Sequence, residues 1–363
     1  MDQSILQISR TKKGKSVMPV PLCHRLHPTP TTGQKLMRMI PVILILSAIS
    51  CNDTRYDEIV AYRKGMNVPS WQSIEYLDNR ITESLLVLSD AGADNIAVVP
   101  TWYQESKVSN QIYPTNNTPI DSAVMHIITV AKAMGYNVML KPHVDVEDGT
   151  FRGNISPNDI TVWFSSYKDF ILHYASIAQQ TDADLFCIGT ELKSLSARNE
   201  WIEIIDSVRN IFDKPILYAA NWDEYPHVSF WQHVDFVGID AYFPLAHNRE
   251  ATIEEYLENF DLWLYQVDNF QKNIEKEIII PEVGFRSIKG SGVTPYDWQY
   301  YGIVDEESQA HAYQTILELL QRKHWLAGIF FWHWDPILKE DSLGYTPYNK
   351  LAEDVLRQFW TDQ

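Results

Sequence analysis

The chain has 363 residues, of which 45% are apolar and 21% are charged, and this composition is typical of a globular protein. Its formal net charge of −17 disfavours nucleic acid and anionic lipid surfaces as partners and suits a neutral substrate. Three cysteines provide no disulfide framework. The sequence contains no Cys-x-x-Cys or His-Glu-x-x-His motif, so we expect neither a metal nor a cofactor.

Residues 1–50 are predicted to be an N-terminal extension that ends in a signal peptide. The short apolar run Met39–Ser50 follows two basic residues and is too short for a comfortable membrane span. It ends in Ala-Ile-Ser before Cys51, which resembles a bacterial lipobox. We therefore expect export, lipidation of Cys51 and a short tether over residues 51–60, with the protein anchored in the periplasm, at the outer membrane or on the cell surface. An ordinary signal peptide is the alternative.

Eight strand candidates follow along the rest of the chain. Most are near-continuous apolar runs, as expected for parallel strands that are covered on both faces. The first is polar and is assigned from its place in the series. The predicted strands are Tyr62–Asn67, Asn95–Thr101, Asn137–His143, Asp184–Gly189, Pro215–Ala220, Val234–Asp240, Glu277–Pro281 and Ala327–Trp332.

Helical patterns fall between these strands, with apolar residues spaced three to four positions apart. Only the segment between the fifth and sixth strands is too short for a full helix. The predicted helices cover 74–88, 124–134, a segment that starts at Ser156-Pro157 and runs through Tyr174, and then 201–212, 253–270, 306–322 and 351–360.

This alternation predicts a single (β/α)8 barrel over residues 61–363. A doubly wound open sheet is the competing fold. That fold requires a glycine-rich phosphate loop after its first strand, and the segment 65–70 is not such a loop.

Two glutamates follow apolar strands directly. They are Glu191, after the fourth strand, and Glu282, after the seventh. In a barrel, the carboxyl ends of the strands meet at one face, where catalytic residues gather. Burying a charge without a function is costly, and a pair of facing carboxylates is what glycoside hydrolysis requires. The pair is therefore the predicted catalytic centre.

Aromatic, amide and histidine side chains follow the other strands. Aromatic rings pack against the apolar faces of sugars, and polar groups bind sugar hydroxyls. Core or loop packing is the structural alternative for each tryptophan, and a hydrogen-bonded structural role is the alternative for the histidine. The candidate substrate-binding residues are Trp71, Trp102, His143, Asn221, Trp222, Tyr242, Trp298, Trp332 and Trp334.

Four motifs together resemble glycoside hydrolase family 113. They are Ile188-Gly-Thr-Glu191-Leu, Gly238-Ile-Asp-Ala-Tyr-Phe-Pro244, Pro281-Glu282-Val-Gly-Phe and Phe330-Phe-Trp-His-Trp-Asp335. The resemblance implies a retaining endo-β-1,4-mannanase, with Glu191 as acid/base, Glu282 as nucleophile and Tyr242 as a hydrogen-bond donor to the nucleophile. The wider clan has asparagine before the acid/base, whereas this chain has Thr190. The partner of the sugar 2-hydroxyl is therefore open between Asn221 and His143.

Three other functions remain open from the sequence. The first is a different retaining β-glycosidase of the same clan, acting on a glucan or another β-glycan. The second is a non-catalytic glycan-binding lipoprotein on a degenerate barrel. The third is an aldolase that forms a Schiff base through Lys141, at the end of the third strand. The sequence leaves the oligomeric state undetermined.

Overall fold

A computed structural model of the protein describes residues 61–361. The predicted signal segment, Cys51 and the tether lie outside these residues. Within residues 61–361, no helix combines the length and the apolar character needed to cross a membrane.

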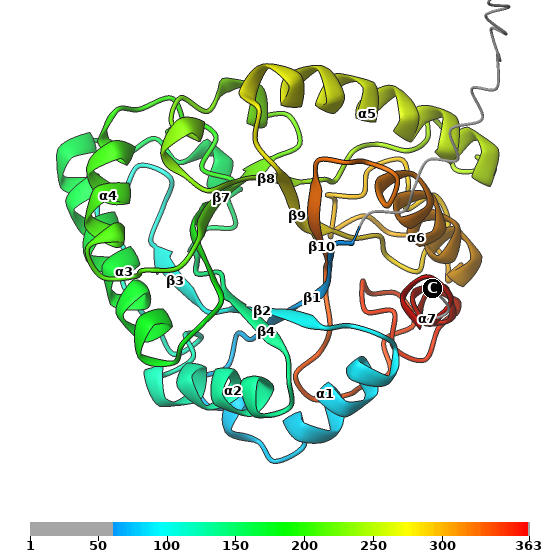
Figure 1. The fold of residues 1–363 in the computed structure, drawn as a ribbon, viewed down its shortest axis with the longest axis horizontal. Helices are drawn as coiled ribbons and strands as arrows, with labels where there is room; N and C mark the ends of the chain where they lie inside the picture. The colour runs from blue at the N-terminus through cyan, green and yellow to red at the C-terminus, as the bar shows by residue number, and fades with distance from the viewer. Residues whose placement is uncertain (1–60, 362–363) are drawn as a thin grey trace, which may run out of the picture. The chain divides into compact units, whose positions relative to one another are not determined.

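Eight parallel strands form a closed barrel (Figure 1). The strands follow one another around the barrel in chain order, and the last pairs with the first. They are β1 (Arg63–Pro69), β2 (Asn95–Val99), β4 (Asn137–Leu140), β6 (Leu185–Thr190), β7 (Ile216–Asn221), β8 (Phe236–Asp240), β9 (Ile278–Val283) and β10 (Leu326–Phe331). The predicted (β/α)8 fold is confirmed, and β6 and β9 are the fourth and seventh strands.

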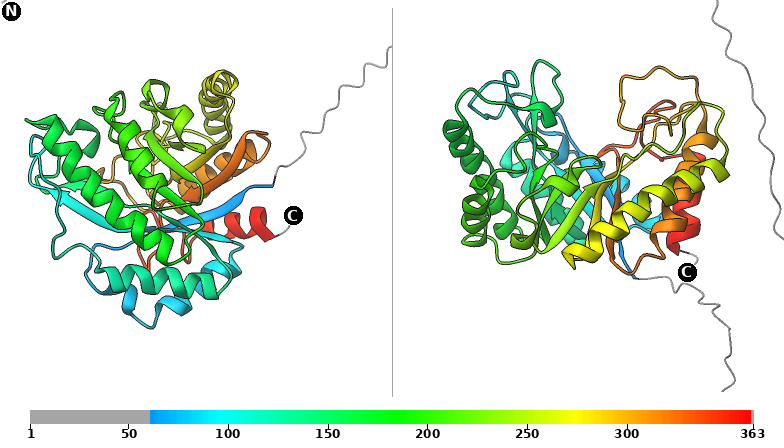
Figure 2. Two further views of the ribbon diagram at one scale, coloured as in Figure 1. Left: turned by 60° about the vertical axis from the view of Figure 1, so that its left-hand side comes forward. Right: turned by 90° about the horizontal axis from the view of Figure 1, so that it is seen from above.

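Helices surround this barrel, as Figures 1 and 2 show. Between β7 and β8 the chain forms only the short 3-10 turns Tyr225–His227 and Trp231–His233, which agrees with the short spacing in the sequence. The helices are α1 (Ile81–Asp90), α2 (Asp121–Ala133), α3 (Ile160–Gln180), α4 (Glu200–Arg209), α5 (Ile253–Ile274), α6 (Glu306–Leu320) and α7 (Leu351–Thr361).

Two helices start later than predicted. The segment predicted to begin at residue 74 forms a 3-10 turn (Glu75–Leu77), and α1 begins later, at Ile81. The helix predicted to begin at Ser156-Pro157 begins at Ile160 instead. The carboxylate of Asp159 accepts hydrogen bonds from the N–H groups of Thr161 and Val162 and so caps α3 at that point.

The second and third predicted strands each divide in two. Pro100 separates β2 from β3 (Thr101–Gln104), and Pro142 lies in the gap between β4 and β5 (His143–Val146). Proline cannot donate a ladder hydrogen bond, so strands commonly break there. β3 and β5 pair in parallel as a separate small sheet, which carries His143 beyond the end of β4.

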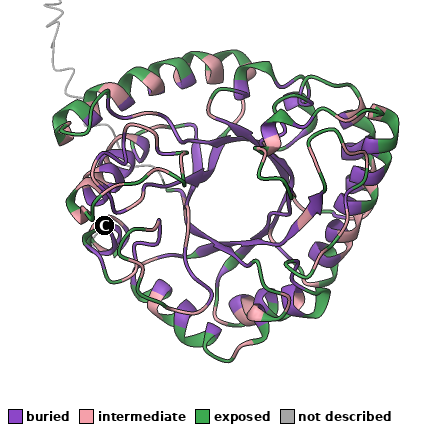
Figure 3. Cartoon of the chain, turned by 180° about the vertical axis from the view of Figure 1, so that it is seen from behind, coloured by how far each residue is buried: buried purple, intermediate pink, exposed green. Residues whose placement is uncertain are grey.

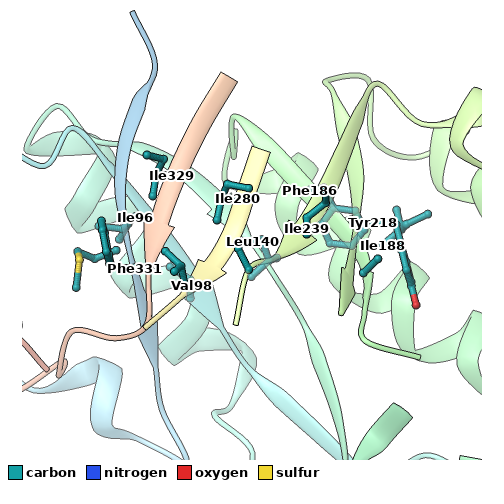
Figure 4. Packing of buried hydrophobic residues seen from close by; sticks show 14 of the residues in the cluster. Ile96, Val98, Leu140, Phe186, Ile188, Tyr218, Ile239, Ile280, Ile329 and Phe331 are labelled. Atoms are coloured by element: carbon teal, nitrogen blue, oxygen red, sulfur yellow. The ribbon is translucent and has the colours of Figure 1, made fainter. Parts of the chain in front are cut away.

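The apolar core has two layers. One fills the space between barrel and helices, and Figure 4 shows part of it, including Ile96 and Val98 of β2 and Ile329 and Phe331 of β10. In Figure 3 the strands are buried and the outer faces of the helices are exposed. The second layer lies inside the barrel, on the alternate residues of the strands. It consists of Ala97, Met139, Leu185, Cys187, Leu217, Ala219, Ile279, Ala327 and Phe330.

Candidate active site

The two glutamates lie at the carboxyl end of the barrel. Glu191 follows β6 directly and Glu282 is the penultimate residue of β9. Their side chains are nearly buried, with 7% and 3% of each residue exposed. Buried carboxylates are costly unless charges or hydrogen bonds compensate, so the surroundings of each one determine its protonation state.

Three side chains from other parts of the chain hold Glu282. Lys141 forms an ion pair with its Oε1 atom, and His143 Nε2 lies 3.3 Å from the same oxygen. The hydroxyl of Tyr242 donates a hydrogen bond of 2.8 Å to Oε2. Burial alone would raise the pKa of Glu282, but the charge of Lys141 and the hydrogen bond of His143 outweigh it and lower the pKa below its ordinary value. Glu282 is therefore ionised and fixed in orientation.

The imidazole of His143 is neutral. Burial, together with the nearby charges of Arg152 and Lys141, lowers the pKa of His143 to about 3. Its ring stacks on Trp332, with ring centroids 5.9 Å apart and an interplanar angle of 7°. The ring therefore orients Glu282 by hydrogen bonding and supports Trp332 by stacking.

Lys141 is enclosed by acidic groups. Its Nζ atom lies 3.9 Å from Oδ1 of Asp240, a completely buried residue. Burial raises the pKa of Asp240 well above its usual range, and the charge of Lys141 only partly opposes this. Burial also lowers the pKa of Lys141, but Asp240 and Glu282 more than offset that and raise it above its ordinary value. Lys141 thus remains a cation bonded to Glu282, whereas a Schiff base requires a free amine.

Glu191 has a different environment. Asn221 donates a hydrogen bond of 3.0 Å to its Oε1 atom, and Arg152 Nη1 lies 3.6 Å from Oε2. Burial raises the pKa of Glu191, the charge of Arg152 opposes this, and the negative charge of Glu282 adds to it, so that the pKa reaches about 8. Glu191 is therefore protonated at neutral pH and can donate a proton.

The backbone of Glu191 lies in the left-handed region, with φ of +53°. Residues other than glycine rarely adopt this conformation, and it persists where surrounding contacts fix it. Here the N–H of Glu191 donates to the carbonyl of Ala219 at 2.7 Å, and the N–H of Leu192 donates to the Tyr218 hydroxyl at 2.9 Å. The turn therefore aims the carboxyl group of Glu191 by backbone geometry as well as by side-chain contacts.

Arg152 is a site residue that the sequence did not reveal. It lies in a 3-10 turn after β5, and its guanidinium bonds Asp145 Oδ1 at 2.6 and 3.2 Å while it faces Glu191. Arg152 lies several residues beyond the end of β5. Neither its position relative to a strand nor a hydrophobic repeat therefore predicts a role in the site.

Two predicted aromatic residues lie beside Trp332 and Asn221. Trp71, which is 44% exposed, meets Trp332 edge-on with ring centroids 6.4 Å apart. Trp222 follows Asn221 in the chain, and its ring stacks on Tyr296 at 6.1 Å. Trp71 and Trp332 thus form an aromatic pair next to His143, while the contact with Tyr296 holds the ring of Trp222.

The loop after β9 carries Tyr296 and Trp298. Trp298 is 67% exposed. Arg286 clamps this loop by donating to the carbonyl oxygens of Trp298 and Tyr300, at 3.0 and 2.6 Å, and to that of Leu343 at 3.0 Å. The clamp joins the loop after β9 to the loop after β10.

Two predicted substrate-binding tryptophans lie elsewhere, and these expectations are corrected. Trp102 packs against Phe170, His173 and Tyr174 of α3, because its side chain points to the helical layer. Trp334 is completely buried, and its indole N–H donates to Ser84 of α1 at 2.9 Å. Both are packing residues in this structure.

Within the part of the chain that the structure describes, no group of His, Cys, Asp and Glu side chains is arranged to hold a metal ion. One buried glutamate is ionised and the other is protonated, which is the division of roles required for nucleophilic and general acid catalysis.

The profile of Glycoside Hydrolase Family 113 matches residues 70–349. Among solved structures, β-mannanase AaManA from Alicyclobacillus acidocaldarius, in complex with ManMIm, is 26% identical with a TM-score of 0.76, over 84% of this chain and 98% of that chain. Another family 113 β-1,4-mannanase is 24% identical with a TM-score of 0.77, over 84% and 100% of the two chains.

A β-glucuronidase from Faecalibacterium prausnitzii shares the fold alone. It is 14% identical with a TM-score of 0.56, over 83% of this chain and 49% of that chain. A comparison with curated protein sequences found no match.

Proposed function

Because the chain belongs to glycoside hydrolase family 113 and is a glycoside hydrolase, we propose that it cleaves β-1,4-linked mannan with retention of anomeric configuration. The carrying observation is the contrast between two buried carboxyl groups at one end of the barrel. Glu282 is held ionised, whereas the pKa of Glu191 is raised to about 8. The likeness to two β-mannanase structures, one of them a β-1,4-mannanase, supports mannan as the substrate.

In the first step, the Glu282 carboxylate attacks the anomeric carbon. Glu191 gives its proton to the glycosidic oxygen, and the bond between that oxygen and the anomeric carbon breaks. The product is a glycosyl-enzyme and a free sugar chain. Tyr242 holds the Oε2 atom of Glu282 during attack, and Lys141 keeps the carboxylate ionised beforehand.

In the second step, Glu191 acts as a base. It takes a proton from water, the water oxygen bonds to the anomeric carbon, and the bond to Glu282 breaks. Both glutamates then return to their initial states. Arg152 faces Glu191 and favours its ionised form in the intermediate.

The positions of the aromatic residues orient the substrate. Glu191 protonates the oxygen that leaves with the aglycone, so the aglycone lies on the side of β6 and β7, where Trp222 follows Asn221. The glycone then lies toward β1 and β10, over Trp332 and beside Trp71. Aromatic rings pack against the apolar faces of sugars.

Asn221 is the better candidate partner for the 2-hydroxyl of the reacting sugar. Its Nδ2 group is bonded to Glu191, while its buried Oδ1 atom has no hydrogen-bond partner among the described residues. The ring of His143 already contacts Glu282 and Lys141. A substrate hydroxyl that donates to Asn221 Oδ1 would satisfy a buried polar atom.

The direct test is hydrolysis of soluble β-1,4-mannan, with β-1,4-glucan in parallel and product sizes recorded. NMR of the first-formed products reports the anomeric configuration. We expect β products from mannan and a loss of several orders of magnitude in rate for Glu282→Ala and Glu191→Gln, without loss of fold. Preference for glucan, an α product, or near-wild-type rates in either variant would contradict the proposal.

We also propose that the enzyme is exported and lipid-anchored through Cys51. The basis is the apolar run that ends in small residues before this cysteine. Metabolic labelling of the full chain with an alkyne-bearing fatty acid should label the wild type and leave Cys51→Ser unlabelled. Equal labelling of both would contradict the assignment.

A further inference from the structure

Glu224 is a buried carboxyl group directly behind the Glu191 turn. It lies in the loop after β7 and is completely buried, although a glutamate in a loop is ordinarily a solvated surface group. Burial raises the pKa of Glu224 to about 7, with hydrogen bonds from Tyr218 and Asn221 opposing the rise. The proposed reaction makes no use of this group, so its burial requires another explanation.

One oxygen of Glu224 fixes the turn that carries Asn221. Its Oε2 atom accepts the N–H of Asn221 at 2.9 Å, and the N–H of Glu224 donates to the carbonyl of Asn221 at 2.8 Å. The side chain of Asn221 in turn donates to Glu191 Oε1 at 3.0 Å. Through this arm, Glu224 sets the position of a direct hydrogen-bond partner of Glu191.

The other oxygen of Glu224 acts through Tyr218. Its Oε1 atom accepts a hydrogen bond of 2.7 Å from the Tyr218 hydroxyl. That hydroxyl accepts the N–H of Leu192, the residue after Glu191, at 2.9 Å. Because the hydroxyl proton is committed to Glu224, the hydroxyl oxygen is free to accept from Leu192. This second arm stabilises the left-handed turn at Glu191.

We propose that Glu224 is a positioning residue for the acid/base Glu191, which it orients through Asn221 on one side and through Tyr218 and Leu192 on the other. The inference rests on the proposed role of Glu191. Glu224 is completely buried and acts only through these two links, so its removal disturbs Glu191 and its partner Asn221.

Glu224→Gln is the informative variant because it preserves the shape of the side chain. A glutamine has only one acceptor oxygen, so its NH2 group must face either the Asn221 N–H or the Tyr218 hydroxyl. In the first orientation the hydrogen bond from the Asn221 N–H is lost. In the second, the NH2 group donates to the Tyr218 hydroxyl oxygen, so the hydroxyl proton loses its acceptor and the Leu192 N–H shares that oxygen with a second donor. Tyr218→Phe is a second variant, which removes the link to Leu192 and leaves Glu224 and Asn221 in place.

The assay compares mannohexaose with 2,4-dinitrophenyl β-mannobioside. The first substrate requires protonation of its leaving group, and the second does not. For each variant we expect kcat for mannohexaose to fall about 10- to 100-fold, part of what a general acid contributes, with KM changed little. We expect kcat/KM for the dinitrophenyl substrate to fall much less than kcat for mannohexaose, and to stay close to wild type in Tyr218→Phe, which leaves Asn221 in place.

Two control variants make the same chemical changes at the other end of the barrel. Tyr136→Phe removes a buried hydroxyl that donates to the Leu85 carbonyl at 2.6 Å, and Asp184→Asn alters a carboxylate that accepts the Val138 N–H at 2.8 Å. Both should retain wild-type ratios between the two substrates. Thermal unfolding of all variants reports any general loss of stability.

Equal losses on both substrates, or a wild-type kcat for mannohexaose in folded Glu224→Gln, would overturn the inference. The proposed function fails separately, if the wild type hydrolyses neither substrate or if Glu191→Gln is fully active on mannohexaose. The two failures are therefore distinguishable.

Discussion

Two glutamates with nearly equal burial have opposite protonation states in this site. The difference comes from their partners, because an ammonium ion, an imidazole and a phenol surround Glu282, whereas an amide and a more distant guanidinium face Glu191. Burial raises the pKa of both carboxyl groups, and only the first set of partners outweighs it.

This contrast predicts how the rate depends on pH. The pKa of Glu191 is raised to about 8, so the acid keeps its proton below that pH and loses it above. We expect kcat/KM for mannohexaose to fall as pH rises through about 8. The dinitrophenyl substrate should lack this alkaline decline, because its leaving group needs no proton. A decline of the same midpoint and size for both substrates would contradict the assignment of Glu191 as the acid.

Lys141 sets the pH at which kcat/KM declines on the acidic side of the pH profile. The ammonium group stabilises ionised Glu282. In Lys141→Gln the pKa of Glu282 should therefore rise, and the acidic decline of kcat/KM should move about one to three pH units higher, as for the loss of a nearby opposite charge. The pH profile with dinitrophenyl β-mannobioside measures this, and an unchanged acidic decline would contradict the role of Lys141. Lys339→Gln, which changes an exposed lysine paired with Asp335, is the control.

The sequence predicted the placement of a site residue wherever the position of that residue along a strand determines its position in the barrel. Glu191 directly follows β6 and Glu282 lies at the end of β9, so the fold itself predicts their common face. Arg152 and Glu224 lie in loops, and their burial depends on side chains from other elements, such as Tyr218. No local pattern records such contacts.

At the scale of elements, the end of β6 is shaped by two tyrosines. A Cβ atom on Gly189 would lie 2.8 Å from the Tyr167 hydroxyl and 2.9 Å from the Tyr218 ring. The hydroxyl of Tyr167 also donates to the carbonyl of Ile188 at 2.7 Å. Glycine at this position lets both rings pack against the strand immediately before Glu191.

Gly189→Ala should therefore disturb both stability and catalysis. We expect a loss of about 1–3 kcal/mol in the free energy of unfolding, typical of overpacking in a core, measured by urea denaturation. Displacement of Tyr218 should also lower kcat for mannohexaose. Gly135→Ala is the matched control, because its Cβ meets nothing within 4 Å while its φ of +95° imposes backbone strain alone. An equal effect on kcat from both variants would contradict the packing argument.

The order and type of the elements were predicted more accurately than their ends. Eight apolar runs alternating with helical patterns suffice to predict a barrel, since each element must bury its apolar face. The strands divide at Pro100 and Pro142 because proline lacks a backbone N–H group. Helix α3 starts late because the Asp159 carboxylate accepts the N–H groups of Thr161 and Val162. A hydrophobic repeat in the sequence contains no information about such hydrogen bonds.

At the scale of the whole molecule, the two ends of the described chain support each other. β1 pairs with β10 to close the barrel, and Lys64 Nζ donates to the Trp360 carbonyl of α7 at 2.7 Å. The Trp360 ring also lies 6.1 Å from that of Phe331. The last helix therefore stabilises the strand pair that completes the sheet.

This arrangement predicts which truncations fold. Compared with the full chain, a chain that ends at Lys350 should unfold at a clearly lower temperature, because the buried faces of Leu356 and Trp360 are lost. Scanning calorimetry measures the difference. An undiminished transition without α7 would contradict this account.

The contacts of Arg286 have a consequence for substitutions in the loop after β9. Arg286 binds Trp298, Tyr300 and Leu343 only through their main-chain oxygens, which every amino acid possesses. Replacing the exposed Trp298 side chain therefore leaves the hydrogen bond that holds its backbone unaffected, so this position can vary while the loop keeps its course.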